Sequence, residues 1–163
     1  MNVIAKKYVK YLDYVNKIIE NALAVILGVM SVLIFWQVVS RYLIGSPSSW
    51  SEELSRFLMV YLVMFGAATA LKKGSLIAVD ALHEALSDKV SKWIKVISEL
   101  ISIVFYVILV IYGWEFASHS SNQIAPGTGL SMFLIYLSMP LGGLFLTLNS
   151  IGSIFNEFIK GKE

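Results

Sequence analysis

The amino-acid sequence predicts an all-α polytopic membrane protein: a four-transmembrane-helix bundle with amphipathic interfacial helices on the cytoplasmic side. The first observation is composition, because 57% of the 163 residues are hydrophobic and only 15% are charged, against about 25% charged in a soluble domain. The second is four long apolar stretches, at about residues 22–43, 53–72, 94–115 and 130–156, with no ionisable residue in the middle of any. Each has about the 20 residues that a helix needs to cross about 30 Å of hydrocarbon. A helix is the structure that satisfies the amides of a single segment in lipid.

The whole chain, residues 1–163, is expected to form a single membrane domain. Four crossings and their connections use nearly all of its length, and a soluble domain needs at least about 50 further residues. Any activity is therefore expected in the bundle, in its short loops or in a partner.

Residues 4–19 precede the first crossing and predict an amphipathic helix. Apolar side chains such as Tyr8, Leu12 and Val15 recur at helical spacing on one face, and lysines and acids project from the other. A basic polar face above an apolar underside fits a helix that lies on the membrane surface. The pattern equally fits the solvated start of the first transmembrane helix, so both interpretations stay open.

The connection between the first and second crossings contains the strongest turn signal in the chain. Arg41 ends the first crossing, where its side chain can reach the lipid headgroups. Residues 45–48, Gly-Ser-Pro-Ser, then break the helix. Ser49-x-x-Glu52 has the spacing of a capping box and predicts the start of the next helix.

The second crossing carries small residues four apart, at Gly66, Ala70 and Gly74. Such a stripe allows another helix to approach closely. We expect packing within this bundle, and the alternative is a docking seam for a larger membrane partner.

Residues 76–93 predict a second amphipathic segment, which bends into the third crossing. The loop that follows that crossing is polar, rich in turn residues and free of lysine and arginine, and it includes Gln123 and Pro126. Within the fourth crossing, Pro140 followed by Gly142 and Gly143 predicts a kink, since proline removes one backbone hydrogen bond.

Basic residues are unevenly divided between the two sides of the predicted bundle. The first loop has only Arg41 and Arg56, and the third loop has no basic residue. By the positive-inside rule both termini are expected to be cytoplasmic. The lysines on that side are Lys6, Lys7, Lys10 and Lys17 before the first crossing, Lys72, Lys73, Lys89, Lys92 and Lys95 between the second and third, and Lys160 and Lys162 after the fourth.

The densest group of polar side chains surrounds the start of the second crossing: Arg41, Trp50, Glu52, Glu53 and Arg56. Both glutamates precede Arg56 by three or four residues, so all three share a helix face, in the order that favours ion pairs. Two interpretations fit this spacing, an ordinary helix start and an electrostatic contact patch for another protein. Catalysis would also require a pocket and an oriented partner group, which the sequence does not indicate, so we expect no enzymatic activity.

Cofactor and metal chemistry finds little support. The chain has no cysteine and two histidines, His83 and His119, and both histidines fall outside the apolar stretches, whereas a haem between helices needs axial ligands inside the bundle. His119 lies one turn after Glu115, but two such ligands make a weak metal site without a third. We expect no cofactor, no metal and no nucleic-acid partner.

The order of short motifs along the chain resembles the small membrane subunit, the DctQ-type or Q subunit, of a tripartite ATP-independent periplasmic (TRAP) transporter. The resemblance spans almost the whole chain. The family's residue pattern after the Lys-Gly step is replaced by Ser75-Leu76, so no role is assigned there. The motifs are Trp50-Ser-Glu-Glu-x-x-Arg56, Phe65-Gly-Ala-Ala-x-Ala-Leu-Lys-Lys-Gly74, Ala78-Val-Asp80, Gln123-Ile-Ala-Pro126 and Tyr136-Leu-Ser-Met-Pro140-Leu-Gly142.

The resemblance implies an accessory scaffold subunit in a bacterial inner membrane. It would support a large polytopic, sodium-coupled subunit in uptake of a carboxylate-bearing solute, an organic acid or sialic acid, delivered by a periplasmic binding protein. An uncharged membrane interior agrees with this, since ion-coupled transport sites show intramembrane carboxylates or broken helices. The alternatives are a self-sufficient small oligomeric transporter, which would need a buried carboxylate, and a redox membrane anchor, which the histidine count opposes.

Overall fold

The computed structural model describes residues 2–73 and 88–160 and contains long helices joined by loops. Helix α1 spans Asn2–Val39 and continues as a π-helical segment, Ser40–Ile44, and α2 spans Ser49–Lys72. Helix α4 spans Asp88–His119, the short α5 spans Met132–Tyr136, and α6 spans Ser138–Lys160. Gly74 and most of the predicted amphipathic segment 76–93 lie outside the described residues.

Within residues 2–73 and 88–160, four helices are long and apolar enough to cross a membrane: Ala5–Ile44, Ser49–Lys72, Val90–His119 and Met132–Glu157. The predicted all-α polytopic fold is therefore confirmed. Helix α1 runs without a break through residues 4–19 and 22–39, and the π-helical segment that continues it covers residues 40–43 of the predicted first crossing. Its 38 residues make it about 57 Å long at 1.5 Å per residue, well beyond the thickness of the hydrocarbon.

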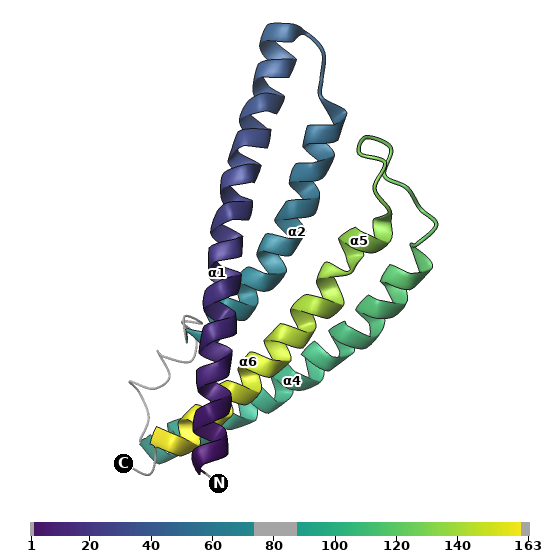
Figure 1. Ribbon diagram of the computed structural model, residues 1–163. Coiled ribbons are helices and arrows are strands. Elements are labelled where there is room, and N and C mark those ends of the chain that lie inside the picture. The colour runs from purple at the N-terminus through teal and green to yellow at the C-terminus, as the bar shows by residue number, and fades with distance from the viewer. Residues whose placement is uncertain (1, 74–87, 161–163) are drawn as a thin grey trace.

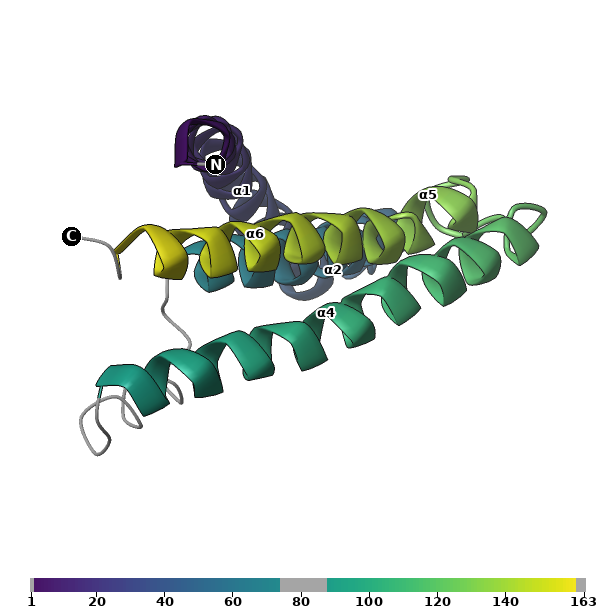
Figure 2. The same ribbon diagram turned by 90° about the horizontal axis from the view of Figure 1, so that it is seen from below.

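Helix α6 is the centre of the bundle, because it contacts α1, α2 and α4, whereas α4 contacts neither α1 nor α2. Figure 1 shows α1 beside α2 and α4 beside α6, as two pairs that diverge toward the ends joined by the connecting loops. Seen from below, after a turn of 90° about the horizontal axis, α6 and α2 lie between α1 and α4 (Figure 2). In the most apolar 18 residues of the span Met132–Glu157, which contains most of α6, 39% of residues are buried. In the most apolar 18 residues of the spans formed by α1 and α4, only 6% are buried. The outer helices therefore present most of their apolar side chains to lipid or to a partner.

Glycines on α6 explain why this helix can approach all three neighbours. A β-carbon at Gly142 would lie 2.7 Å from Cβ of Met64 on α2, and one at Gly143 would lie 3.1 Å from the carbonyl oxygen of Tyr106 on α4. Near the other end of α6, a β-carbon at Gly152 would lie 2.7 Å from Leu12 of α1. The buried core next to these contacts consists of Ala68, Leu71 and Leu146, with Tyr106 and Phe145 packed against it.

Gly66, the first residue of the small-residue stripe on α2, does not have the role that its spacing predicts. A β-carbon at Gly66 would meet no atom within 4 Å, so the expectation that Gly66 packs closely within the bundle is wrong. The reason is rotational: α2 faces its neighbours through Met64, Ala68 and Leu71, which are spaced four and three residues apart, and Gly66 lies off that face.

The fourth crossing is interrupted where the proline predicts it. Helix α5 ends at Tyr136 and α6 begins at Ser138, so Leu137 separates them. Pro140 has no N–H to donate to the carbonyl of Tyr136, one turn earlier. Ser138 is fully buried at this break, and its hydroxyl donates to the carbonyl of Ile135 over 2.7 Å.

Candidate functional site

The predicted polar residues gather where the start of α2 meets the loop between α4 and α5. We call this group the loop cluster: Arg41, Glu52, Glu53, Arg56, Gly127 and Thr128. A cavity of about 470 Å³ lies beside it, lined by Glu52, Glu53, Arg56, Gln123 and Pro126 among others. The structure thus brings together five residues that the sequence analysis singled out in two distant segments.

The two glutamates of the loop cluster have different partners. Glu52 pairs with Arg56 one turn later on α2, and its second oxygen lies 4.0 Å from Nη2 of Arg41 at the end of the first crossing. Both arginine side chains are more than half exposed, at 54% and 71%. An ion pair exposed to this degree contributes little to stability, about 0–1 kcal/mol. Its arginines remain accessible to another molecule.

Glu53 instead holds the loop between α4 and α5. Its Oε2 accepts hydrogen bonds from the backbone N–H of Gly127 over 3.0 Å, the N–H of Thr128 over 2.6 Å and the Thr128 hydroxyl over 2.9 Å. A β-carbon at Gly127 would lie 2.9 Å from that same oxygen and 3.0 Å from the backbone carbonyl oxygen of Ser49, so a larger residue would push the loop away from the start of α2 or displace the carboxylate. The predicted pairing of Glu53 with Arg56 is not formed, because the carboxylate points to the loop.

Backbone hydrogen bonds within the loop between α4 and α5 hold its two ends together, in addition to its contacts with Glu53. The N–H of Met132 donates to the carbonyl of Gln123, and the N–H of Ala125 donates to the carbonyl of Leu130, each over 2.9 Å. Gly129 adopts a left-handed φ of 71°, which favours glycine. Sequence analysis did not identify Gly127 or Thr128 as site residues. The only sequence signal was the Pro-Gly-Thr-Gly turn pattern that follows Ala125.

The predicted capping box at the start of α2 is wrong. The helix does begin at Ser49, but the N-cap is Ser48, whose side chain makes no capping hydrogen bond. Ser49 is already helical, so it cannot act as the cap, and the Glu52 carboxylate is engaged by Arg56 and Arg41. Trp50 is 47% exposed beside this helix start.

A second group of polar contacts lies at the opposite end of the bundle, where α1, α2, α4 and α6 meet. Asn16 and Asn149 donate to each other's side-chain oxygens over 2.7 and 2.9 Å, and Asn149 also donates to the carbonyl of Ala68 over 2.7 Å. The two side chains are 3% and 0% exposed. We call Asn16 and Asn149 the amide pair.

The residue after Asn149 reaches in the other direction. The Ser150 hydroxyl donates to the carboxylate of Glu99 on α4, so two consecutive residues of α6 bind all three neighbouring helices. Sequence analysis passed over Glu99, which lies within the span Val90–His119 but outside its uncharged middle. Its signal was a lone acid one turn after Lys95 in an otherwise apolar stretch.

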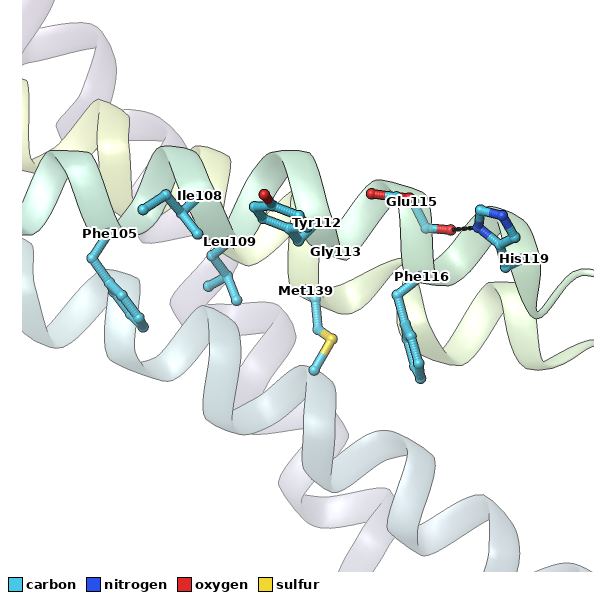
Figure 3. Close-up of a pocket in the computed structure, with 9 residues that line it drawn as sticks. All are labelled: Phe105, Ile108, Leu109, Tyr112, Gly113, Glu115, Phe116, His119 and Met139. Atoms are coloured by element: carbon cyan, nitrogen blue, oxygen red, sulfur yellow. Dashed lines mark hydrogen bonds between the residues drawn. The ribbon is translucent and has the colours of Figure 1, made fainter.

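An apolar groove of about 590 Å³ runs along α4, and Met139 of α6 also lines it (Figure 3). Phe105, Ile108, Tyr112 and Phe116 line it, and Glu115 and His119 stand at its polar end. Nδ1 of His119 lies 2.8 Å from the backbone carbonyl oxygen of Glu115, not from its carboxylate. Among residues 2–73 and 88–160, no three metal-ligating side chains come together.

Comparison with known proteins identifies relatives over most of the chain. The sequence profile described as "Tripartite ATP-independent periplasmic transporters, DctQ component" matches residues 30–160. The chain is 27% identical to the sialic acid TRAP transporter small permease protein SiaQ of Vibrio cholerae, over 87% of this chain and 82% of that protein. It is 25% identical to the sialic acid TRAP transporter permease protein SiaT of Haemophilus influenzae, over 93% of this chain but 25% of that protein. It is 26% identical to the C4-dicarboxylate TRAP transporter small permease protein DctQ of Vibrio cholerae, over 64% of this chain and 45% of that protein.

Proposed function

The chain belongs to the DctQ component family of tripartite ATP-independent periplasmic transporters, and from this premise we propose that it braces a large, sodium-coupled permease subunit. It is a small subunit of the multi-pass inner-membrane part of a transporter and not an enzyme. In the proposed assembly, the large subunit carries solute and sodium, and a periplasmic binding protein delivers the solute.

The observation that carries this proposal is how the polar groups inside the bundle are used. Asn16, Asn149 and Ser150 are all buried, and each hydrogen-bonds to another helix. A transport site needs groups that can release their partners and bind an ion or solute at membrane depth. Polar side chains committed to neighbouring helices serve instead to hold those helices together.

The apolar faces of α1 and α4 support the second half of the proposal, the partnership. Large side chains such as Phe35 on α1 and Ile101 on α4 are 70% and 67% exposed. Faces of this kind suit lipid or the transmembrane helices of a larger subunit. The sialic acid TRAP transporter permease protein SiaT matches 93% of this chain, but the match covers only 25% of SiaT. A permease that contains much more than this region favours a large permease as the neighbour of this chain.

We propose a carboxylate-bearing solute, either sialic acid or an organic acid. The support is the printed names of relatives, which specify sialic acid and C4-dicarboxylates. Both classes are anions that carry at least one carboxylate, and the choice between them would be made by the binding protein and the large subunit.

The direct test is uptake into proteoliposomes with the binding protein and a sodium gradient supplied. We expect no uptake by this chain alone, none or little by the large subunit alone, and full uptake when both are present. Solute accumulation by this chain alone would refute the scaffold role and favour the self-sufficient transporter.

We further propose that both termini are cytoplasmic, as the lysine distribution favours. The chain has no cysteine, so a single introduced cysteine can be labelled from one side of the membrane without background. A cysteine at Asn2 should resist a membrane-impermeant maleimide in intact cells, and one at Gln123 should react. Labelling in the opposite pattern would reverse the orientation.

The loop cluster is proposed as the contact for a periplasmic partner. Arg41 and Arg56 are exposed beside a cavity, and Glu53 fixes the loop that forms its other wall. Glu53→Lys or Arg56→Glu should lower uptake while membrane insertion stays intact. If both single variants and the double variant with reversed charges transport normally, the cluster only supports the start of the helix.

A further inference from the structure

The two acids of α1 form ion pairs with lysines at the end of α2. Asp13 lies 3.0 Å from Nζ of Lys72, and Glu20 lies 3.0 Å from Nζ of Lys73. The side chain of Lys72 is only 12% exposed, so this cation is committed to its partner. These pairs also place residues 13–20 of α1 at the level where α2 ends.

The lysines of the same helix have no such partner among the residues that the structure describes. Lys6, Lys10 and Lys17 share one stripe with Asp13 at helical spacing, and Lys7 begins the adjacent stripe. All four lysines are exposed, and within the part of the chain that the structure describes none forms an ion pair. Because Asp13 and Glu20 are paired with Lys72 and Lys73, the four lysines give the exposed face of α1 a net positive charge.

The stripe that begins at Lys7 continues with aromatic and aliphatic side chains. Tyr11, Tyr14 and Ile18 follow Lys7 by four, seven and eleven residues and are 69%, 66% and 52% exposed. The opposite face of the helix is occupied, since Leu12 and Asn16 are buried and the Tyr8 hydroxyl donates to the carbonyl of Leu148 over 3.1 Å. The outward face therefore combines amphipathic rings with ammonium groups that form no ion pair among residues 2–73 and 88–160.

We propose that this face, defined by Lys6, Lys7, Lys10 and Lys17 with Tyr11 and Tyr14, binds the phosphates of anionic phospholipid headgroups. The face belongs to a helix that enters the membrane directly: from Asn21 to Ser40, α1 and its π-helical extension carry no charge. Lys17 and Lys10 lie about one and three turns before this run, and Lys7 and Lys6 about four turns before it. Long lysine side chains reach toward the headgroups, and tyrosines prefer the same zone. Lysines near an anionic leaflet are attracted to it.

The orientation given under the proposed function would place these headgroups in the cytoplasmic leaflet, but the binding itself does not depend on that orientation. A lipid-retention measurement in nanodiscs exposes both faces of the bilayer equally. An inverted orientation would therefore leave the lipid result unchanged, and a failed lipid result would leave the orientation unchanged.

The experiment uses the full chain in nanodiscs of equal parts phosphatidylglycerol and phosphatidylcholine, with retained lipids counted by native mass spectrometry. The wild-type chain should retain phosphatidylglycerol in preference to phosphatidylcholine. Each lysine changed to glutamine should lower this preference by up to about fivefold, which corresponds to the attraction of about 1 kcal/mol between one lysine and an anionic membrane surface. The variant with all four lysines changed to glutamine should retain the two lipids equally.

The matched control changes the same four lysines to arginine, which keeps the charge and should keep the preference. These positions are exposed, so an unchanged melting temperature in all variants verifies that folding is intact. Added sodium chloride should reduce the preference of the wild type because exposed charges are screened. Equal retention of both lipids by the wild type, or an undiminished preference in the glutamine variant, overturns the proposal. Equal retention would also be the result if the natural occupant were an acidic protein surface.

Discussion

Replacing Asn149 with leucine removes the polar contact that joins α6 to α1 and α2 at their crossing. The side chain is fully buried and makes three hydrogen bonds: two exchanged with Asn16 and one donated to the carbonyl of Ala68. Leucine has the same branched arrangement of side-chain heavy atoms but cannot hydrogen-bond, so the substitution removes the hydrogen bonds and keeps the side-chain shape, although the leucine methyl groups are larger.

The expected loss follows from the worth of hydrogen bonds between transmembrane helices, on average about 0.6 and at most about 1.7 kcal/mol each. Three such bonds give a decrease of about 2–5 kcal/mol in the free energy of unfolding. The lower part of this range is favoured because Asn16 keeps one partner, the carbonyl of Leu12 at 2.8 Å.

Unfolding can be followed by tryptophan fluorescence while the fraction of denaturing detergent in mixed micelles is raised, since the chain has four tryptophans. Asn156→Leu is the matched control, the same substitution on an exposed position of the same helix, and should change stability little. The double variant Asn16→Leu/Asn149→Leu should cost less than the sum of the single variants, because each single variant leaves the other amide without its partner. The reasoning is refuted if Asn149→Leu costs no more than Asn156→Leu, or if the two single effects simply add.

Three further predictions concern the glycines, the loop and Glu99. Gly142→Ala should lower the free energy of unfolding by about 1–3 kcal/mol, because its β-carbon would overlap Met64. At Gly66 a β-carbon meets open space, so Gly66→Ala should raise the free energy of unfolding by up to about 1 kcal/mol. Equal melting temperatures of the two variants would contradict this. Glu53→Ala should speed hydrogen exchange at the amides of Gly127 and Thr128, because the Glu53 carboxylate binds both. Glu52→Ala is the control and should leave the exchange of these amides unchanged. Similar exchange rates in the two variants would count against the loop contact. Glu99→Gln keeps an acceptor for the Ser150 hydroxyl and should leave sodium-dependent uptake by the complete transporter unaffected; a lost sodium dependence would place an ion-coupling carboxylate in this subunit.

The four spans could be predicted from the sequence because hydrophobicity is a local property. A run of about 20 apolar residues satisfies the bilayer whatever lies beside it. The interruption near Pro140 was predictable for the same reason, since a missing N–H affects its own turn. The loop cluster was predictable in part: Glu52 and Arg56 lie one turn apart and do pair.

Choices between competing partners were not predictable. Glu53 has Arg56 within reach on its own helix but binds the backbone of Gly127 and Thr128, more than 70 residues away in sequence. Nothing near Glu53 encodes that loop, and three donors around one oxygen outweigh an exposed ion pair. The prediction of a capping box was wrong for a similar reason, because the Glu52 carboxylate pairs with Arg41 and Arg56.

The sequence by itself determined the number of membrane crossings, their approximate limits and the absence of charge from their middle, since these depend only on how each segment partitions into lipid. The tertiary structure decided which face of each helix meets another. It selected Gly142, Gly143 and Gly152 over Gly66 for close contact, and it paired Asn16 with Asn149. In a chain this apolar nearly every face could be buried, so shape and the pairing of a few polar groups fix the arrangement.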